Sequence, residues 1–337
     1  MKDLSPLYNE LPKTEIHCHL EGAIRTATII DIARQHGLPL PSYEASALER
    51  RVKVLDQWRD LHAVLEAFDI ARRCFVTAEV AGRIAWELFE DSAGQNVRLL
   101  EVRFSPDWAF SHNGLDWDAA LEGILHARRR AESELGLAVG LIAISSRSLG
   151  PASCARTVEW AIRHAGDIAG IDLADSERDF PLSDFLPSIR RAQDAGLRLT
   201  IHSGEDTPAS FVVETIRRAA PDRIGHGIHI IEDPAALALV KQRGITLEVS
   251  PWSNYLTHSV ERIEQHPLKR LFDLGVRVTI NSDDPEVLDT NLNHEYRIAH
   301  EVLGMSLEDI AACNRHACDA SFLPEAVRRQ VRQRYFE

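Results

Sequence analysis

Short apolar runs rich in β-branched residues recur along the chain, and longer segments with a helical spacing of apolar positions separate them. Segments 80–89 and 119–135, for example, place their apolar residues on one helical face. Eight runs predict strands, at residues 15–20, 99–104, 138–144, 168–173, 197–202, 223–226, 245–249 and 276–281. Because parallel strands need a long crossover, this alternation predicts parallel pairing. We therefore expect an α/β fold, a closed (β/α)8 barrel, with an open doubly wound sheet as the alternative.

The chain shows no repeat of fixed period and no linker long enough to separate domains, so residues 1–337 are interpreted as one barrel domain. The first crossover, residues 22–97, is much longer than the others and predicts extra helices after the first strand. One of these is expected over residues 55–68, with an apolar face of Trp58, Leu61, Leu65 and Phe68. The insertion is interpreted either as a lid or as ordinary helical packing.

The composition and charge of the chain limit the classes of molecule that it is expected to bind. Hydrophobic residues make up 45% of the 337 positions and charged residues 26%, which is ordinary for a globular chain. A formal net charge of −13 repels a phosphate backbone and argues against a nucleic-acid polymer as partner, but not against a small neutral ligand.

Nothing in the sequence predicts a membrane protein. No run of eighteen apolar residues exists, and residues 1–13 lack the apolar core of a signal peptide. The five cysteines are dispersed without a Cys-x-x-Cys pair, which favours free thiols in a reducing compartment. We expect a cytoplasmic protein; the sequence leaves its oligomeric state open.

Polar side chains gather at the C-terminal ends of four predicted strands. They are His17, His19, His202, Glu205, His226, Asp283 and Asp284. His17 and His19 stand two positions apart, so a strand points both to one face. The C-terminal ends of barrel strands are where barrel enzymes assemble their active sites, and we expect these side chains to meet there.

Three imidazoles and one carboxylate suit a borderline divalent metal such as zinc. The candidate ligands are His17, His19, His202 and Asp283. Such a metal activates water as a nucleophile, and a carboxylic acid close by can protonate the atom where charge accumulates. Glu205, His226 and Asp284 would flank that spot. The pattern predicts metal-assisted hydrolysis without naming the bond.

The ordered motifs resemble the adenosine deaminase family of the metal-dependent amidohydrolase barrels. His202-Ser203-Gly204-Glu205 is similar to the family's His-Ala-Gly-Glu. The resemblance covers nearly the whole chain, at residues 13–23, 101–106, 170–174, 202–205, 223–227, 250–257, 281–285 and 320–325.

This resemblance implies zinc-dependent deamination of adenosine and 2′-deoxyadenosine to the inosines and ammonia, with one Zn²⁺ per subunit. Glu205 would protonate purine N1 as metal-activated hydroxide attacks C6. His226 would orient the hydroxide, helped by Asp284, which would also contact the purine near N7. The implied substrate contacts are His19, Glu21, Ala174, Asp175, Gly204 and Asp284.

Two positions depart from the adenosine enzymes. Asp175 stands where they have a glycine whose backbone N–H meets purine N3, so it either narrows the pocket or is a tolerated exchange. Glu21 replaces the aspartate that holds the ribose 5′-hydroxyl, and glutamate there is common in adenine and aminodeoxyfutalosine deaminases. Gly225 stands where adenine deaminases tend to carry aspartate, and residues 251–257 favour the nucleoside enzymes. Adenosine is the first interpretation; aminodeoxyfutalosine or adenine is the alternative.

Other classes predict other sequences. The nucleobase deaminases built on Pro-Cys-x-x-Cys need a Cys-x-x-Cys pair, which this chain lacks. A non-catalytic binding protein on the same barrel would show a broken metal set or a missing acid. A hydrolase of esters or amides would not need an acid such as Glu205 set against a ring nitrogen.

Overall fold

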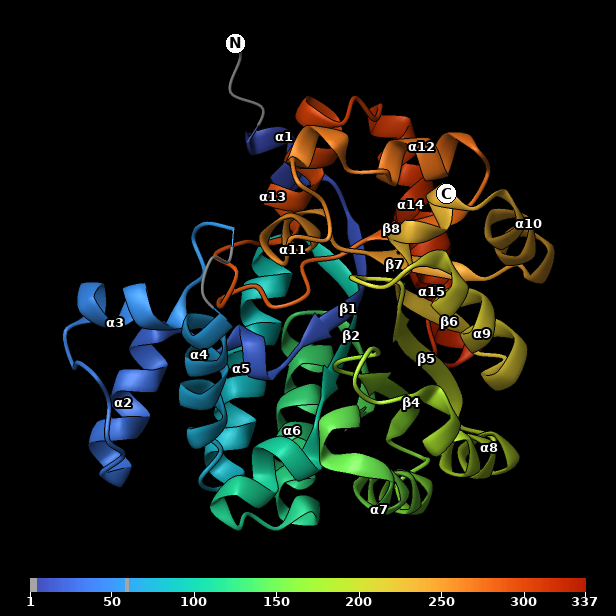
Figure 1. Ribbon diagram of the computed structural model, residues 1–337. Coiled ribbons are helices and arrows are strands. Elements are labelled where there is room, and N and C mark those ends of the chain that lie inside the picture. The colour runs from blue at the N-terminus through green and yellow to red at the C-terminus, as the bar shows by residue number, and fades with distance from the viewer. Residues whose placement is uncertain (1–4, 58–60) are drawn as a thin grey trace.

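The computed structural model describes residues 5–57 and 61–337. Within them, parallel strands pair in chain order from β1 to β8 and form a nearly closed barrel (Figure 1). An open doubly wound sheet would reverse its strand order, so the barrel is confirmed. Each expected strand is present with its ends within two residues of the prediction. The strands are β1 Lys13–His19, β2 Val97–Phe104, β3 Ala138–Ser146, β4 Ile168–Ala174, β5 Arg198–Ser203, β6 Arg223–His226, β7 Thr246–Val249 and β8 Arg277–Ile280.

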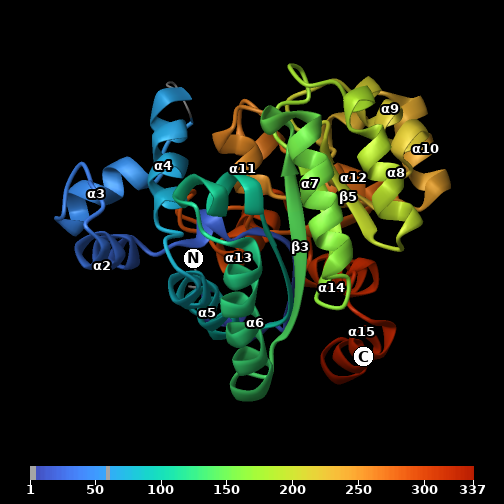
Figure 2. The same cartoon turned by 90° about the horizontal axis from the view of Figure 1, so that it is seen from below.

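Helices surround the strands on the outside. Those of the described residues are α1 Ser5–Glu10, α2 Thr26–His36, α3 Ala45–Val52, α4 Leu61–Arg73, α5 Ala78–Gly94, α6 Trp117–Glu134, α7 Gly150–Arg163, α8 Leu186–Asp194, α9 Ala209–Ala219, α10 Pro234–Arg243, α11 Pro251–Leu256, α12 Leu268–Asp273, α13 Leu292–Arg297, α14 Leu307–Ala320 and α15 Glu325–Tyr335. Helices α5 and α6 lie side by side (Figure 2). Gly123 permits this approach, because a Cβ atom there would lie 2.0 Å from the carbonyl oxygen of Ala78.

The long first crossover holds helices α2 to α5, as expected. The helix expected over residues 55–68 is wrong over 55–57, which are not helical. There the backbone N–H of Val54 donates to Val287 O (2.7 Å) and the Gln57 amide donates to Tyr255 O (3.1 Å). These bonds to α11 and to the loop after β8 replace helical ones.

The expected apolar face of this helix is described only in part. Trp58 and the side chains of Leu61 and Leu65 lie outside the described residues. Phe68 packs against a small buried cluster that includes Leu256 and Leu288. Both come from segments that follow strands β7 and β8, so α4 lies against the C-terminal face of the barrel.

Strands β8 and β1 close the barrel with little regular pairing. Within the described part, they meet at one isolated bridge, between Cys18 and Asp283. Two backbone bonds form it: His19 N–H donates to Asp283 O (2.7 Å), and Asp283 N–H donates to His17 O (3.1 Å). The closure therefore brings three residues of the candidate site together.

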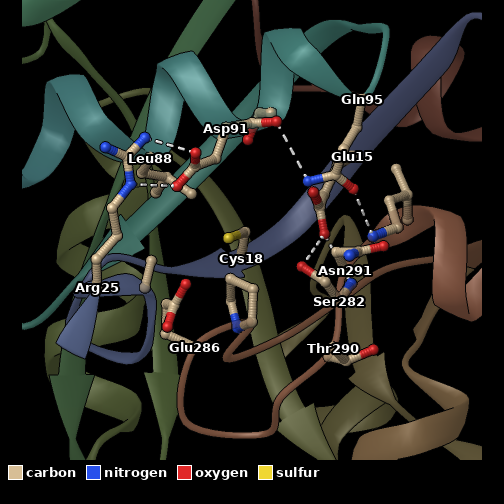
Figure 3. Close-up of a pocket in the computed structure, with 14 residues that line it drawn as sticks. Glu15, Cys18, Arg25, Leu88, Asp91, Gln95, Ser282, Glu286, Thr290 and Asn291 are labelled. Carbon is tan, nitrogen blue, oxygen red and sulfur yellow. Dashed lines mark hydrogen bonds and ion pairs between the residues drawn. The ribbon is translucent and has the colours of Figure 1, made fainter. Parts of the chain in front are cut away.

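Side chains satisfy the other backbone groups along this seam. Asn281 Oδ1 accepts from Ile16 N–H (3.2 Å), and Glu15 Oε1 accepts from Ser282 N–H (2.7 Å). Figure 3 shows the Glu15 carboxylate directed at Ser282. Buried backbone groups need partners, and here side chains supply what a missing ladder would.

The segment after α14 plugs the N-terminal end of the barrel. The Glu101 carboxylate accepts from the hydroxyl of Ser321 (2.6 Å), and the Arg223 guanidinium lies 3.6 Å from the centre of the Phe322 ring. Arg223 also donates to Ala320 O (3.0 Å). This plug keeps water from the charged side chains inside.

Two sequence-based expectations concern the rest of the chain. All five cysteines are buried free thiols. Among the residues that the structure describes, no helix has both the length and the apolar character needed to cross a membrane.

The seam yields a stability test. Asn314 Oδ1 accepts from Thr14 N–H and from the Tyr296 hydroxyl, both at 2.7 Å and buried. We expect Asn314→Ala to lower the free energy of unfolding by about 2–6 kcal/mol, because it orphans two buried donors and each costs roughly 1–3 kcal/mol. Urea denaturation followed by circular dichroism measures it. Glu122→Ala, at an exposed site on α6, is the control and should stay within about 0.5 kcal/mol of wild type; an equal result for both would contradict the role of the seam.

Candidate active site

Ionisable side chains from four strands converge at the C-terminal face of the barrel. Single donor atoms of His17, His202, His226 and Asp283 all lie within 4.8 Å of one another. His19, Asp283 and Asp284 form a second such group, which shares Asp283 with the first. The structure thus brings together six of the seven strand-end residues that the sequence singled out. The seventh, Glu205, lies beside His226.

His17 comes from the middle of β1 and is fully buried. Its Nδ1 lies 2.8 Å from Glu248 Oε2, and its Nε2 lies 3.1 Å from Asp283 Oδ1. A carboxylate beside Nδ1 keeps the proton of a neutral imidazole on that nitrogen. The lone pair of Nε2 is thereby directed at the centre of the cluster.

His202, near the end of β5, repeats this arrangement. Its Nδ1 lies 3.1 and 3.0 Å from the two carboxylate oxygens of Asp172. Burial lowers the pKa of His202 to about 3, although Asp172 opposes the shift, so the ring is neutral at pH 7. Its Nε2 also presents a lone pair to the cluster.

A buried ionic network beneath the histidines holds both carboxylates. Arg103 donates to Asp172 (2.8 Å) and to Glu248 (2.8 Å), and Arg223 lies 2.5 Å from Glu248. Burial by itself would raise the pKa of Asp172, but His202 and Arg103 hold it below its usual value. Ionised carboxylates are therefore available to orient the imidazoles.

Sequence reasoning missed this network, although the sequence carries a signal for it. Glu101 and Arg103 stand two positions apart in β2, and Glu248 interrupts the apolar β7. Charged residues at positions that face a barrel interior are costly unless they are paired. That pattern predicts interior ion pairs.

His19 and Asp284 lie at the rim of the cluster. His19 Nε2 lies 3.2 Å from Asp283 Oδ1. Asp284 packs against Gly22, where a Cβ atom would come within 1.9 Å of Asp284 Oδ1, so this position requires glycine. Burial raises the pKa of Asp284 to about 7, and its Oδ1 has no hydrogen-bond partner among the described residues.

The Glu205 carboxylate is partly accessible, with 26% of its side chain exposed. Its Oε2 lies 3.5 Å from His226 Nε2. It follows β5 directly, after Gly204, whose φ of 69° turns the chain at the strand end. The carboxylate therefore faces both solvent and the cluster.

Glu177 fixes the turn that carries Glu205, a role that the sequence did not reveal. Its carboxylate accepts from Ser203 Oγ (2.6 Å), from Gly204 N–H (2.7 Å) and from Thr207 Oγ1 (2.8 Å). The expected substrate contact Gly204 therefore uses its N–H within the protein.

The other expected substrate contacts lie at neighbouring strand ends. Glu21 is buried, and its Oε1 accepts from Ser105 N–H (2.6 Å). Its Oε2 has no hydrogen-bond partner within the described residues. Ala174, the last residue of β4, is buried and pairs with Ser146 of β3.

Asp175 adopts a left-handed backbone conformation of the kind that favours glycine. Its φ is 85°, and its carboxylate accepts from Ser146 Oγ (2.7 Å) and Ser148 N–H (3.2 Å). His226 and Asp283 also have positive φ, 59° and 65°. Non-glycine residues rarely adopt this conformation, and such strain is concentrated at functional sites.

A cavity of about 340 Å³ lies outside the cluster, between β1, α5 and the loop after β8. Figure 3 shows the Arg25–Asp91 ion pair and the Glu15–Ser282 contact along its walls. None of the clustered histidines lines it. We therefore assign the chemistry to the histidine cluster.

The donor set suits a zinc ion. His17 and His202 direct Nε2 at the centre of the cluster, His19 adds a third ring nitrogen, and Asp283 adds a carboxylate oxygen. Nitrogen and oxygen donors of this kind are typical of catalytic zinc sites. The geometry alone also admits His226, whose ring lies within the same group.

The carboxylates behind the histidines can be tested through metal affinity. We expect Asp172→Asn to weaken zinc binding about 10–100-fold, because an amide holds the Nδ1 proton of His202 less firmly. Competition with a chromophoric chelator, on variants with a wild-type circular dichroism spectrum, measures the affinity. Asp175→Asn, the same change just beyond the same strand, should bind zinc normally. Unchanged affinity in Asp172→Asn would argue against the orienting role.

Sequence comparison places these residues in a known context. The family model for adenosine deaminase matches residues 12–336. A curated adenosine deaminase of Erwinia tasmaniensis is 35% identical over 326 residues, which cover 97% of this chain and 98% of that protein.

Solved structures agree. An adenine deaminase from Arthrobacter aurescens superposes with a TM-score of 0.89 at 26% identity, covering 95% of this chain and 97% of that one. A zinc-bound amidohydrolase from Burkholderia ambifaria gives 0.88 at 25%, covering 99% and 92%. The N6-methyl-AMP deaminase of Arabidopsis thaliana gives 0.85 at 27%, covering 98% of each chain. The chain belongs to the adenosine deaminase family and is a hydrolytic aminohydrolase on a (β/α)8 barrel.

Proposed function

We propose that this enzyme deaminates adenosine and 2′-deoxyadenosine to inosine and 2′-deoxyinosine, with release of ammonia, and that it uses one zinc ion per subunit. The observation that carries the proposal is the convergence of oriented imidazoles and Asp283 beside Glu205 and His226. Family membership supports a 6-aminopurine as the substrate class.

His17, His19, His202 and Asp283 would hold the metal. When bound, zinc would supply hydroxide at neutral pH and polarise the reacting centre. The protein's part is to aim the ligand atoms at the metal. Glu248 and Asp172 do this for the two buried imidazoles.

Glu205 would donate a proton to purine N1 as hydroxide adds to C6. The attacked carbon loses its aromatic stabilisation, and protonation of the ring nitrogen lowers that barrier. The partial exposure of Glu205 supports this role, because the group must reach a ligand that enters from solvent.

His226 and Asp284 would orient the hydroxide and the purine. His226 Nε2 lies 3.5 Å from Glu205 and 3.8 Å from Asp283 Oδ2, between the proposed acid and a proposed ligand. Asp284 Oδ1 has no hydrogen-bond partner among the described residues, and burial raises the pKa of this group to about 7. A protonated Asp284 carboxyl can therefore donate to purine N7, which only accepts.

We infer that a nucleoside suits the site better than a nucleotide. Glu21 carries a buried carboxylate oxygen without a partner among the described residues, at the position expected to meet the ribose end. A hydroxyl group can donate to that oxygen, whereas a phosphate would bring negative charge against it. Glu21 and His19 complete the proposed substrate contacts on the β1 side.

Asp175 is proposed to be a tolerated exchange for glycine. Its backbone keeps a left-handed φ, and its carboxylate is occupied by Ser146 and Ser148. Those contacts draw the side chain away from the space where a purine would meet Ala174 and the backbone of residue 175.

Adenine and aminodeoxyfutalosine are the alternative substrates. Glu21 in place of aspartate is the feature that favours them. Both share the 6-aminopurine ring, so the proposed roles of Glu205 and His226 would be unchanged.

The proposal extends to the whole chain. Residues 1–337 would form one domain, with the insertion 22–97 as a lid, supported by the packing of Phe68 near the loops after β7 and β8. Five free thiols support a cytoplasmic location.

Glu205→Gln tests the proton donor. We expect zinc content to stay at the wild-type level and kcat to fall at least about 100-fold, because an amide cannot protonate N1. Elemental analysis and ammonia release measure the two. Asp206→Asn, the same change one residue on at an exposed site, should keep both. Full activity in Glu205→Gln would rule out its assigned role.

A substrate panel tests the specificity. Ammonia release and the ultraviolet change should be compared for adenosine, 2′-deoxyadenosine, adenine, AMP and aminodeoxyfutalosine. We expect kcat/KM for AMP to be at least about 100-fold below that for adenosine, since like charges brought together cost several kcal/mol. Glu21→Gln should narrow this gap. No turnover of any of the five would overturn the function, and efficient turnover of AMP would overturn the nucleoside assignment.

A further inference from the structure

Three hydrogen bonds in series run from the backbone N–H of Leu268, at the start of α12, to the imidazole of His226. We call this series the relay. Leu268 N–H donates to His266 Nδ1 (3.2 Å). His266 Nε2 lies 3.1 Å from Asn254 Oδ1, and Asn254 Nδ2 lies 3.0 Å from His226 Nδ1. All three side chains are buried, with Asn254 at 0% and His226 at 1% exposure.

The Leu268 N–H group determines which atom donates and which accepts in every hydrogen bond of the relay. An amide N–H can only donate, so Nδ1 of His266 must accept and carries no proton. Burial lowers the pKa of His266 to about 3, and the ring is therefore neutral with its proton on Nε2. That N–H requires an oxygen opposite it, which turns the carbonyl of Asn254 toward His266.

The amide group of Asn254 then faces His226 with its NH2. This group can only donate, so Nδ1 of His226 must accept. A neutral His226 therefore has its proton on Nε2, the nitrogen that points to Glu205 and Asp283. The assignment follows from the Leu268 N–H alone and does not depend on how the two ends of the Asn254 amide are labelled.

We propose that Asn254 and His266 are positioning residues that fix this tautomer of His226, so that it donates a hydrogen bond into the active site and is excluded as a metal ligand. The inference deepens the proposed function and rests on it for the catalytic consequence only. It also resolves an ambiguity of the site, because distance alone admits His226 to the metal set.

Two other histidines of the site, His17 and His202, have the opposite arrangement. His17 and His202 each have a carboxylate beside Nδ1, which places the proton there and leaves Nε2 with a lone pair for a metal. His226 has an amide donor beside Nδ1, and the outcome is reversed. Three imidazoles that lie within one cluster are thus divided by their outer partners into two ligands and one donor.

The Nε2–H group of His226 faces two carboxylates of the site. His226 Nε2 lies 3.5 Å from Glu205 Oε2 and 3.8 Å from Asp283 Oδ2. Its N–H is directed at the space beside these two carboxylates, where an attacking oxygen needs orientation. With the other tautomer, a lone pair would meet the lone pairs of that oxygen, and orientation would be lost.

Asn254→Asp reverses the relay with almost no change of shape. A carboxylate only accepts, so it would keep the bond from His266 Nε2–H and would require a proton on Nδ1 of His226. Long-range 1H–15N spectra of protein labelled at histidine, recorded without metal, report the protonated nitrogen. We expect His226 to be protonated at Nε2 in the wild type and at Nδ1 in Asn254→Asp. Asn293→Asp on α13 is the matched control and should leave His226 unchanged.

Turnover supplies a second readout. We expect kcat of Asn254→Asp to fall at least about 100-fold, as a wrong histidine tautomer does in other enzymes, with KM within about threefold of wild type. His266→Phe removes the donor to Asn254 and frees its amide to turn. We expect it to give His226 15N shifts between those of the two tautomers.

The outcomes separate the relay from the reaction. A wild-type His226 protonated at Nδ1, or one that stays protonated at Nε2 in Asn254→Asp, would overturn the relay even in an active deaminase. The expected tautomers in a protein that deaminates none of the purines would leave the relay standing and remove the proposed function. Since the wild-type spectrum decides the tautomer by itself, a variant that fails to fold does not remove the test.

Discussion

The position of the protons on two buried imidazoles is the constraint on which the site depends. His17 and His202 offer Nε2 to a metal only while Nδ1 keeps the hydrogen, and each Nδ1 faces a buried carboxylate, Glu248 or Asp172. Those carboxylates stay ionised inside the barrel because Arg103 contacts both. Loss of one partner from a buried pair of this kind costs about 3–5 kcal/mol. The orientation of the histidines at the C-terminal face therefore depends on the ion pairs in the barrel interior beneath them.

The barrel interior is built in layers that depend on one another. Phe322 and Ser321 seal the N-terminal end and contact the lowest charged side chains. Arg223 links that plug to Glu248, which in turn holds an imidazole. Replacement of one interior charged residue would thus alter contacts both at the plug and at the proposed metal site. A barrel enzyme of this kind uses its core for orientation as well as for packing.

The sequence predicts the periodic parts of this structure well. Alternation of apolar runs located every strand, and the rule that barrel chemistry lies at C-terminal strand ends brought Glu205 and the clustered residues to one place. The prediction of a helix failed at residues 55–57, where bonds to distant segments replace helical ones. Sequence reasoning also missed Glu177 and Asn254, because their roles come from single hydrogen bonds between segments that no period relates. Proton positions on imidazoles are decided by such contacts.

The bridge between the first and last strands has a consequence for biosynthesis. His17 emerges early from the ribosome, and Asp283, which completes the backbone bridge beside it, emerges near the end. At typical rates of synthesis the two are separated by roughly 15–50 s. During that interval the nascent chain holds histidines without the residue that closes the wall around them. Metal binding at the complete set of proposed ligands would therefore require that nearly the whole barrel has been synthesised.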